Sequence, residues 1–263
     1  MTMLTPNDLP TAPPLIELSG ASIASAQEPD VALVEQVNWR LRAGEYWAFG
    51  GLQWAGKSDW LTTVAGLQPP AAGGHFLFGQ ETSMLTQPEL IAARLRVGLV
   101  FENGGRLFTQ LTVEENVALP LRYHRNCPPE EAREAVEAVL ELTGLGEFAG
   151  QVASQLNRSW RQRVALARAL ILQPEVLLLD NPLAGLDPRQ TRWWLDTFDA
   201  LNAGHPSLAH RPLALVATTD DLRPWQARAR QFALLQGRRW VPLGDRAELA
   251  ASGGTALHEF MAV

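Results

Sequence analysis

Eight residues at positions 51–58 constrain the fold of this chain more than any others. They read G-L-Q-W-A-G-K-S, which is a complete G-x-x-x-x-G-K-[ST] phosphate loop. A short apolar run at 46–49 leads into the loop, and a helical pattern follows it from Lys57. A glycine loop between a strand and a helix surrounds phosphate oxygens with backbone N–H groups, and the helix N-terminus adds a favourable dipole. The pattern therefore predicts an α/β nucleotide-binding fold.

Two side chains of the loop and one distant carboxylate complete the predicted site for ATP and Mg²⁺. Lys57 would reach the β- and γ-phosphates, and the Ser58 hydroxyl would ligate Mg²⁺. Asp180 follows the apolar run 176–179, which is typical of a buried strand, and would hold the same ion. A chance match is disfavoured, because the strand, the helix and the aspartate all stand where the motif requires them. The predicted nucleotide-binding residues are Gly51, Leu52, Gln53, Trp54, Ala55, Gly56, Lys57, Ser58, Asp59 and Asp180.

Trp54 is the unusual residue of this loop. Related loops usually carry glycine there, which permits a positive φ and a close approach to phosphate. Either the indole weakens binding, or it covers the nucleotide or a facing subunit. No aromatic residue stands at 22–26, where a base-stacking side chain would be expected, so the sequence gives no support for adenine stacking.

Strand-like and helical segments alternate along the chain, which predicts a parallel sheet. The expected strands begin near Leu15 and cover 31–41, 46–49, 95–101, 176–179, 213–218 and 232–235, with a hairpin at 73–79. Helices are expected at 57–67 and at 159–172, and the pattern is helical from 114 to about 145, where Pro128 and Pro129 open a helix rich in Glu and Ala. We expect a flexible arm at 1–14, one domain at 15–263, and an inserted helical subdomain at about 112–172.

The bulk composition excludes several classes of protein. The formal net charge is -6, which argues against a nucleic-acid partner because phosphate backbones select basic surfaces. No run approaches the roughly 18 apolar residues of a membrane span, and the N-terminus has no basic segment ahead of an apolar one. The single cysteine, Cys127, excludes an internal disulfide. A cytoplasmic location fits these observations.

With these motifs in order, the chain resembles the ATP-binding subunit of ABC transporters over nearly its full length. Residues 97–108 (VGLVFENGGRLF) and 111–121 (LTVEENVALPL) are similar to the Q-loop region of that family. Residues 161–170 (RQRVALARAL) match the helix after its signature motif, and 183–188 (LAGLDP) match its D-loop, with Asp187 as the D-loop aspartate. The run N-G-G-R-L-F at 103–108 looks most like the corresponding segment of subunits that serve Mla/MCE-type lipid transport. The resemblance implies a P-loop NTPase fold of ABC type, with a mainly parallel core sheet, an antiparallel β portion and the helical insertion.

Three residues with chemical roles in the family are replaced here. Glu102 takes the place of the Q-loop glutamine, where it could still ligate Mg²⁺. Asn181 takes the place of the catalytic glutamate, and an amide can orient a water but cannot accept its proton; loss of a general base typically costs about 10²–10⁴ in rate. Thr219 takes the place of the switch histidine. These three positions are the degenerate catalytic residues that the resemblance implies.

The signature motif is replaced as well, by Leu156, Asn157, Arg158, Ser159 and Trp160. In the family, its glycines allow a helix N-terminus to approach the γ-phosphate that the opposite subunit holds. Here residues 157–160 would face the partner's ATP. The first interpretation is that this contact is lost; the alternative is that Arg158 places its guanidinium on the partner's γ-phosphate, as arginine fingers do.

The resemblance implies a subunit on the inner face of the plasma membrane, bound to transmembrane permease chains. Its dimer would be a homodimer or a heterodimer with another ABC ATPase. The favoured function is ATP binding in a lipid or other hydrophobic-substrate transporter, with hydrolysis weak or absent. One alternative is a fully active ATPase in which Glu102, another acid or the substrate phosphate serves the water. The other is a soluble, non-transport member of the superfamily.

Overall fold

The computed structural model describes residues 13–28 and 31–251, so most of the expected arm at 1–14 lies outside the described residues. Within these ranges, ten strands form a mixed sheet in the order β5-β4-β1-β2-β10-β9-β3-β8-β7-β6. The strands are β1 Ile16–Ala24, β2 Ala32–Leu41, β3 Tyr46–Gly51, β4 Ala72–Leu77, β5 Gln80–Glu81, β6 Val97–Val100, β7 Val176–Leu179, β8 Ala214–Thr219, β9 Gln231–Gln236 and β10 Arg239–Asp245.

The described part of the chain also holds seven α-helices and six short 3₁₀ turns. The helices are α1 Lys57–Val64, α2 Gln87–Arg94, α3 Val113–His124, α4 Pro129–Leu142, α5 Arg158–Leu170, α6 Pro188–Ala203 and α7 Arg246–Ala251. The turns are η1 Thr82–Met84, η2 Glu102–Gly104, η3 Gly146–Phe148, η4 Ala153–Gln155, η5 Pro206–Leu208 and η6 Arg223–Trp225. No described helix is both long and apolar enough to cross a membrane.

Two helical segments show how the chain ends a helix. The helical stretch expected from 114 to 145 is divided into α3 and α4, and α4 begins at the prolines that the sequence marked as a helix start; Asn126, with φ +48, turns the chain between the two helices. Helix α1 ends at Val64 rather than Leu67, because Gly66 turns the chain with φ +71. Both breaks arise from backbone conformations that a helix cannot contain.

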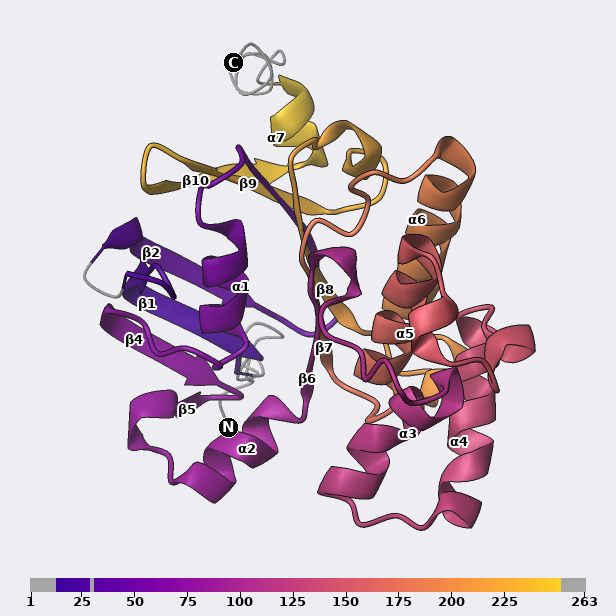
Figure 1. Ribbon diagram of the computed structural model, residues 1–263. Helices are drawn as coiled ribbons and strands as arrows, with labels where there is room; N and C mark the ends of the chain where they lie inside the picture. Colours follow the sequence, from indigo (N-terminus) through magenta and orange to yellow (C-terminus); the bar gives the residue numbers. More distant parts are fainter. Residues whose placement is uncertain (1–12, 29–30, 252–263) are drawn as a thin grey trace, which may run out of the picture.

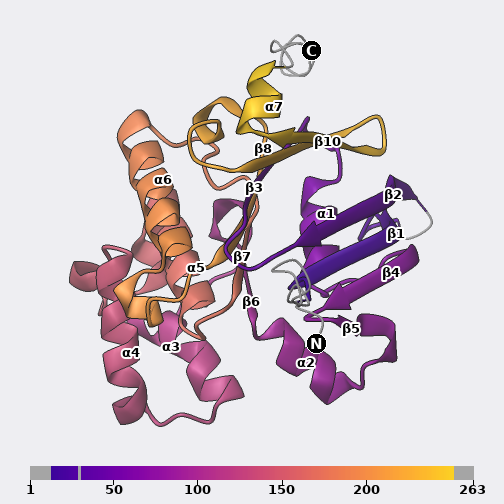
Figure 2. The ribbon, with the colours of Figure 1, turned by 180° about the vertical axis from the view of Figure 1, so that it is seen from behind.

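The sheet has a parallel half and an antiparallel half (Figure 1). Strands β9, β3, β8, β7 and β6 pair in parallel, whereas β2, β1, β4 and β5 pair antiparallel. Helices α3 to α6 lie on one side of the parallel half, and α1 lies on the other side, between it and β1 and β2; Figure 2 shows the same layers from behind. Each side has its own apolar core. Helices α3, α4 and α5 come from the chain between β6 and β7 and form the helical side expected from the sequence.

An aromatic cluster fixes the helix that follows the phosphate loop. Trp60 of α1 stacks on Trp240 of β10 with 5.7 Å between ring centroids, and its edge contacts Phe49 of β3 at 4.5 Å. Trp39 of β2 closes the group at 5.0 Å from Trp60. Since Trp60 is fully buried, this packing sets the position of the first turn of α1, which carries Lys57 and Ser58.

Candidate functional site

The predicted phosphate loop connects β3 to α1, as the sequence indicated. Gly56 precedes the helix with φ +85, in the left-handed region that favours glycine. Trp54 also has a positive φ, +66, and its side chain is 95% exposed. The first N–H groups of α1 have no partner within the helix, as at every helix start, and are therefore free to receive phosphate oxygens.

Lys57 lies at the centre of a partly buried polar group. Its Nζ donates to the carbonyls of Gly51 at 2.6 Å and Leu52 at 2.7 Å, and to the Asp220 carboxylate at 2.7 Å. An ammonium has three protons, so all three are used within the chain. To bind a phosphate, Lys57 must therefore release at least one of these partners.

Asp180 accepts hydrogen bonds on both carboxylate oxygens. Ser58 Oγ donates to one at 2.7 Å, and Thr218 Oγ1 donates to the other at 3.0 Å. The carboxylate comes from the end of β7, where it is 4% exposed, and the two hydroxyls come from α1 and β8. The predicted pair of Ser58 and Asp180 thus meets, although 122 residues separate the two in sequence.

Asn181 and Thr219, the predicted degenerate positions, both lie at this edge of the sheet. Asn181 has φ +43, which Asn tolerates better than most residues; its backbone N–H donates to Thr218 Oγ1, and its Nδ2 donates to Asp220 Oδ2 at 2.8 Å. Thr219 Oγ1 instead bonds within its own turn, to the Asp221 carbonyl at 2.9 Å and from the Asp221 N–H at 3.1 Å.

Asp220 is the site residue that the sequence reasoning missed. The sequence 220–225 looks like a capped helix start, with no chemical role. In the structure the 3₁₀ turn η6 forms there, with Asp221 Oδ1 accepting from the Arg223 N–H at 2.9 Å, and the Asp220 carboxylate lies between Lys57 and Asn181. Strand pairing carried the missing signal: Thr219 of β8 is opposite Gly50 of β3, so Asp220 leaves the sheet beside the phosphate loop.

Glu102 begins the turn η2, and its carboxylate lies 3.9 Å from the Arg158 guanidinium. Arg158 also donates to the carbonyl of Ala184 at 3.2 Å, in the predicted D-loop. Gly104 holds η2 against α5, because a Cβ on this residue would lie 2.9 Å from the Arg161 carbonyl oxygen and its φ is +81. Arg158 therefore has partners within its own chain.

The other signature and D-loop residues have structural contacts. Asn157 caps α5 by accepting from the Trp160 N–H at 3.2 Å, so this helix begins at Arg158. Ser159 Oγ accepts from Gln190 of α6 at 3.1 Å, and Asp187 caps α6 by accepting from the Gln190 N–H at 2.8 Å. Asp59, in the first turn of α1, accepts from the backbone N–H of Ala26 at 2.7 Å.

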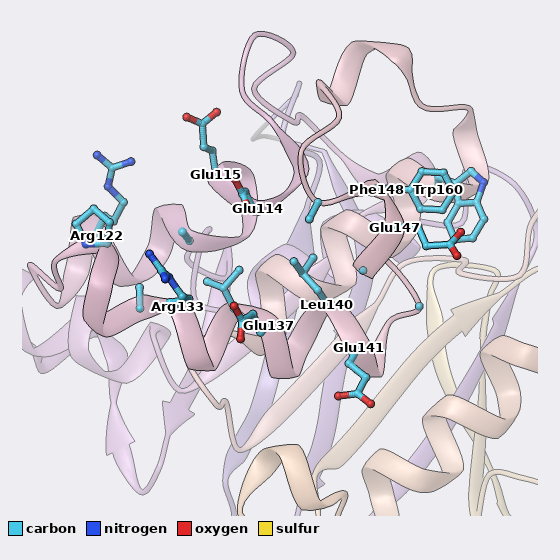
Figure 3. Close-up of a pocket in the computed structure, with 17 residues that line it drawn as sticks. Glu114, Glu115, Arg122, Arg133, Glu137, Leu140, Glu141, Glu147, Phe148 and Trp160 are labelled. Atoms are coloured by element: carbon cyan, nitrogen blue, oxygen red, sulfur yellow. The ribbon is translucent and has the colours of Figure 1, made fainter.

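A separate hollow of about 1040 Å³ opens between α3, α4 and η3 (Figure 3). Its apolar floor includes Leu140 and Phe148, and Trp160 packs on Phe148 with 4.3 Å between ring centroids. Five glutamates and two arginines surround it: Glu114, Glu115, Glu137, Glu141, Glu147, Arg122 and Arg133. None of its lining residues belongs to the phosphate loop. The hollow is thus distinct from the Lys57 site.

The residues around Lys57 fit a magnesium nucleotide. A carboxylate and a hydroxyl already in contact provide hard oxygen ligands of the kind that Mg²⁺ takes from P-loop proteins, with phosphates and waters completing the shell. Among the described residues, no cluster of three or more His, Cys, Asp or Glu side chains could hold a metal ion by itself.

Comparison with known families gives one match over more than half of the chain. The family model described as "ABC transporter" matches residues 34–184. The "Methionine import ATP-binding protein MetN" of Myxococcus xanthus is 33% identical over 246 residues, which cover 93% of this chain and 72% of that protein. The protein of the same name from Geobacillus kaustophilus is 31% identical, covering 85% of this chain and 63% of the relative. Both relatives are named for methionine import, not for lipid transport.

Solved structures show the same fold. The cbiO1 protein of Clostridium perfringens, described as part of the ABC transporter complex cbiONQ, superposes with a TM-score of 0.76 at 20% identity and 92% coverage of both chains. The ATP-binding cassette MJ0796, described as a dimer bound to ADP and Pi, superposes with a TM-score of 0.74 at 26% identity, covering 85% of this chain and 95% of that one. The fold is that of a P-loop NTPase cassette, as the sequence predicted.

Proposed function

This chain belongs to the ABC transporter family as an ATP-binding subunit, and from that premise we propose that it binds Mg²⁺-ATP and hydrolyses it slowly. One observation carries the proposal: the lysine, hydroxyl and carboxylate of a nucleotide site are assembled, while the residue after Asp180 is an amide. Binding draws on the assembled groups, whereas turnover requires a base that Asn181 cannot supply. Nucleotide binding would then regulate the assembly more than hydrolysis drives it.

The partners follow from the family. We propose that two cassettes, two copies of this chain or one copy and a paralogue, enclose ATP between a phosphate loop and residues 157–160. Permease chains in the plasma membrane would hold the pair at the cytoplasmic face. The groove beside α3, lined by Leu111, Tyr123 and Pro128 among others, supports a docking role, since the Tyr123 side chain is 80% exposed there.

For the cargo, we propose methionine or a similar small molecule ahead of a lipid. The two relatives described above, which cover 93% and 85% of this chain, are named for methionine import, while the lipid expectation rests on the sequence of residues 103–108 alone. Co-expression with a candidate permease, followed by ATPase assays with methionine or with phospholipid, tests this order. Stimulation by phospholipid but not by methionine would reverse it.

A binding assay on the purified full-length chain tests the main proposal. Lys57 is the only lysine in the sequence, so mass spectrometry can follow its acylation as a single event. Mg²⁺-ATP should protect Lys57 from the reagent, and a fluorescent ATP analogue should bind. Phosphate release in the same sample should be slow, and Lys57→Ala should lose the binding. Failure of the wild-type chain to bind the analogue or protect Lys57 would refute the proposal, and so would rapid release.

A further inference from the structure

The carboxylate of Asp220 connects the two residues on which binding and turnover depend. Oδ1 accepts from Lys57 Nζ at 2.7 Å, and Oδ2 accepts from Asn181 Nδ2 at 2.8 Å. The Asp220 side chain is 42% exposed, whereas that of Lys57 is 9% exposed. A carboxylate is therefore present next to the residue that replaced the glutamate, and water can reach it.

We propose that Asp220 accepts the proton of the attacking water in this chain, and that Asn181 is the residue that positions it. This inference rests on the proposed function, because it concerns the slow turnover of bound ATP. The water oxygen forms a bond to the terminal phosphorus as the bond from that phosphorus to the bridging oxygen breaks. ADP leaves with the bond's electron pair, and the water proton passes to Asp220.

Nucleotide binding would prepare Asp220 for this role. In this proposal Asp220 is the partner that the Lys57 ammonium releases for the phosphates, so that Oδ1 can accept from a water. Oδ2 remains held by the Asn181 amide, so the carboxylate does not swing freely into solvent. The exchange of an ion pair for a phosphate contact is an added cost, which is consistent with slow turnover.

The other acids near the site are committed to other partners. Both oxygens of Asp180 accept from hydroxyls of Ser58 and Thr218. Glu102 lies beside the guanidinium of Arg158, and Asp221 accepts two hydrogen bonds from Arg223 Nε at 2.9 Å and one from its Nη2 at 2.7 Å. Asp220 is the acid paired with Lys57, which must release at least one of its three partners when phosphate binds.

The test compares four variants of the full-length chain in single-turnover phosphate release with Mg²⁺-ATP. Asp220→Asn removes the base and keeps the shape, and Asp220→Glu keeps a carboxylate. Asp221→Asn is the matched control, because it changes the same charge on the next residue. Asn181→Gly removes the amide without straining the backbone, since glycine accepts φ +43. Binding of the fluorescent analogue and protection of Lys57 are measured on every variant.

Asp220→Asn should lower the single-turnover rate at least 100-fold while binding and protection stay within about threefold of wild type. The single-turnover rate of Asp220→Glu should be within about tenfold of the wild-type rate, and that of Asp221→Asn should equal it. Asn181→Gly should lower the rate constant about tenfold without weakening binding, which separates positioning from a general loss of structure.

Turnover in Asp220→Asn equal to that of wild type would overturn the inference, and so would bound ATP that the wild-type chain never hydrolyses. Loss of analogue binding in Asp220→Asn, with an unchanged circular dichroism spectrum, would also overturn it, because Asp220 would then belong to the binding site. In each of these outcomes the wild-type chain still binds the analogue, so the proposal that it binds Mg²⁺-ATP is not affected. That proposal is refuted only if the wild-type chain binds no nucleotide.

Discussion

Trp54 is expected to destabilise the fold through its backbone and not through its side chain. With φ +66 it occupies the left-handed region, which costs an L-residue about 1–2 kcal/mol. Its indole is 95% exposed, so its removal forfeits little packing. Trp54→Gly relieves the backbone cost but gives the unfolded chain more freedom, worth about 0.4–1 kcal/mol in the opposite direction. The net expectation is a stabilisation of about 1 kcal/mol.

Trp54→Ala is the matched comparison, because it removes the indole and keeps the Cβ that causes the strain. Thermal melting of the two variants should place Trp54→Gly about 2–4 °C above Trp54→Ala. Trp54→Ala should itself melt close to wild type, as exposed substitutions usually do. Equal melting temperatures for the glycine and alanine variants would refute the reasoning, since the left-handed conformation would then carry no cost.

Three further outcomes follow from the contacts described. His75 is 2% exposed, its ring contacts the Val64 carbonyl, and burial lowers its pKa from 6.5 to about 4. Between pH 4 and 6.5 the unfolded chain therefore binds more protons at this histidine than the folded chain does. The free energy of unfolding should fall by up to about 3 kcal/mol as pH drops from 6.5 to 4. Urea titrations of His75→Asn should show a smaller fall over the same pH range. Asn116 is fully buried and bonds both backbone groups of Phe108, so Asn116→Ala should cost about 2–3 kcal/mol and expose residues 105–112 to limited proteolysis. Arg158→Ala should change the turnover of an active dimer less than about threefold, since its Glu102 contact is long and half exposed; a loss near 10³ would instead identify it as an arginine finger.

Motifs with fixed spacing, apolar runs and the alternation of strands with helices predicted most of the fold. The loop at 51–58, the apolar strand before Asp180 and the parallel sheet all stand where the pattern placed them. The start of α4 was marked by the prolines at 128 and 129, because proline is favoured in the first turn of a helix, whereas the left-handed turn at Asn126 just before it had no signal in the apolar pattern. Periodicity records which face of a helix is buried, and one residue in a left-handed conformation leaves no mark on it.

The sequence predicted only some residues of the nucleotide site, because some belong to motifs and others are brought in by strand pairing. Lys57, Ser58 and Asp180 belong to motifs in which each residue has a fixed neighbour, so their roles could be expected from spacing. Asp220 belongs to no such motif; it lies 163 residues from Lys57 and reaches it because β8 pairs with β3. The sequence 220–225 was compatible with a helix cap, and only the strand register distinguishes the two arrangements.

The contact of Gly104 with α5 determines how motion could travel through this cassette. The turn η2 and the carbonyl of Arg161 approach so closely that no side chain fits between them. Two segments in such contact move together, because neither can slide without a backbone collision. A displacement of α5 would therefore carry Glu102 with it, away from or toward the edge of the sheet where Asp180 ends β7. The helices α3 to α5 and the edge of the sheet that holds the nucleotide site would then move in a coupled way, and the turn at Gly104 would limit how far one can move without the other.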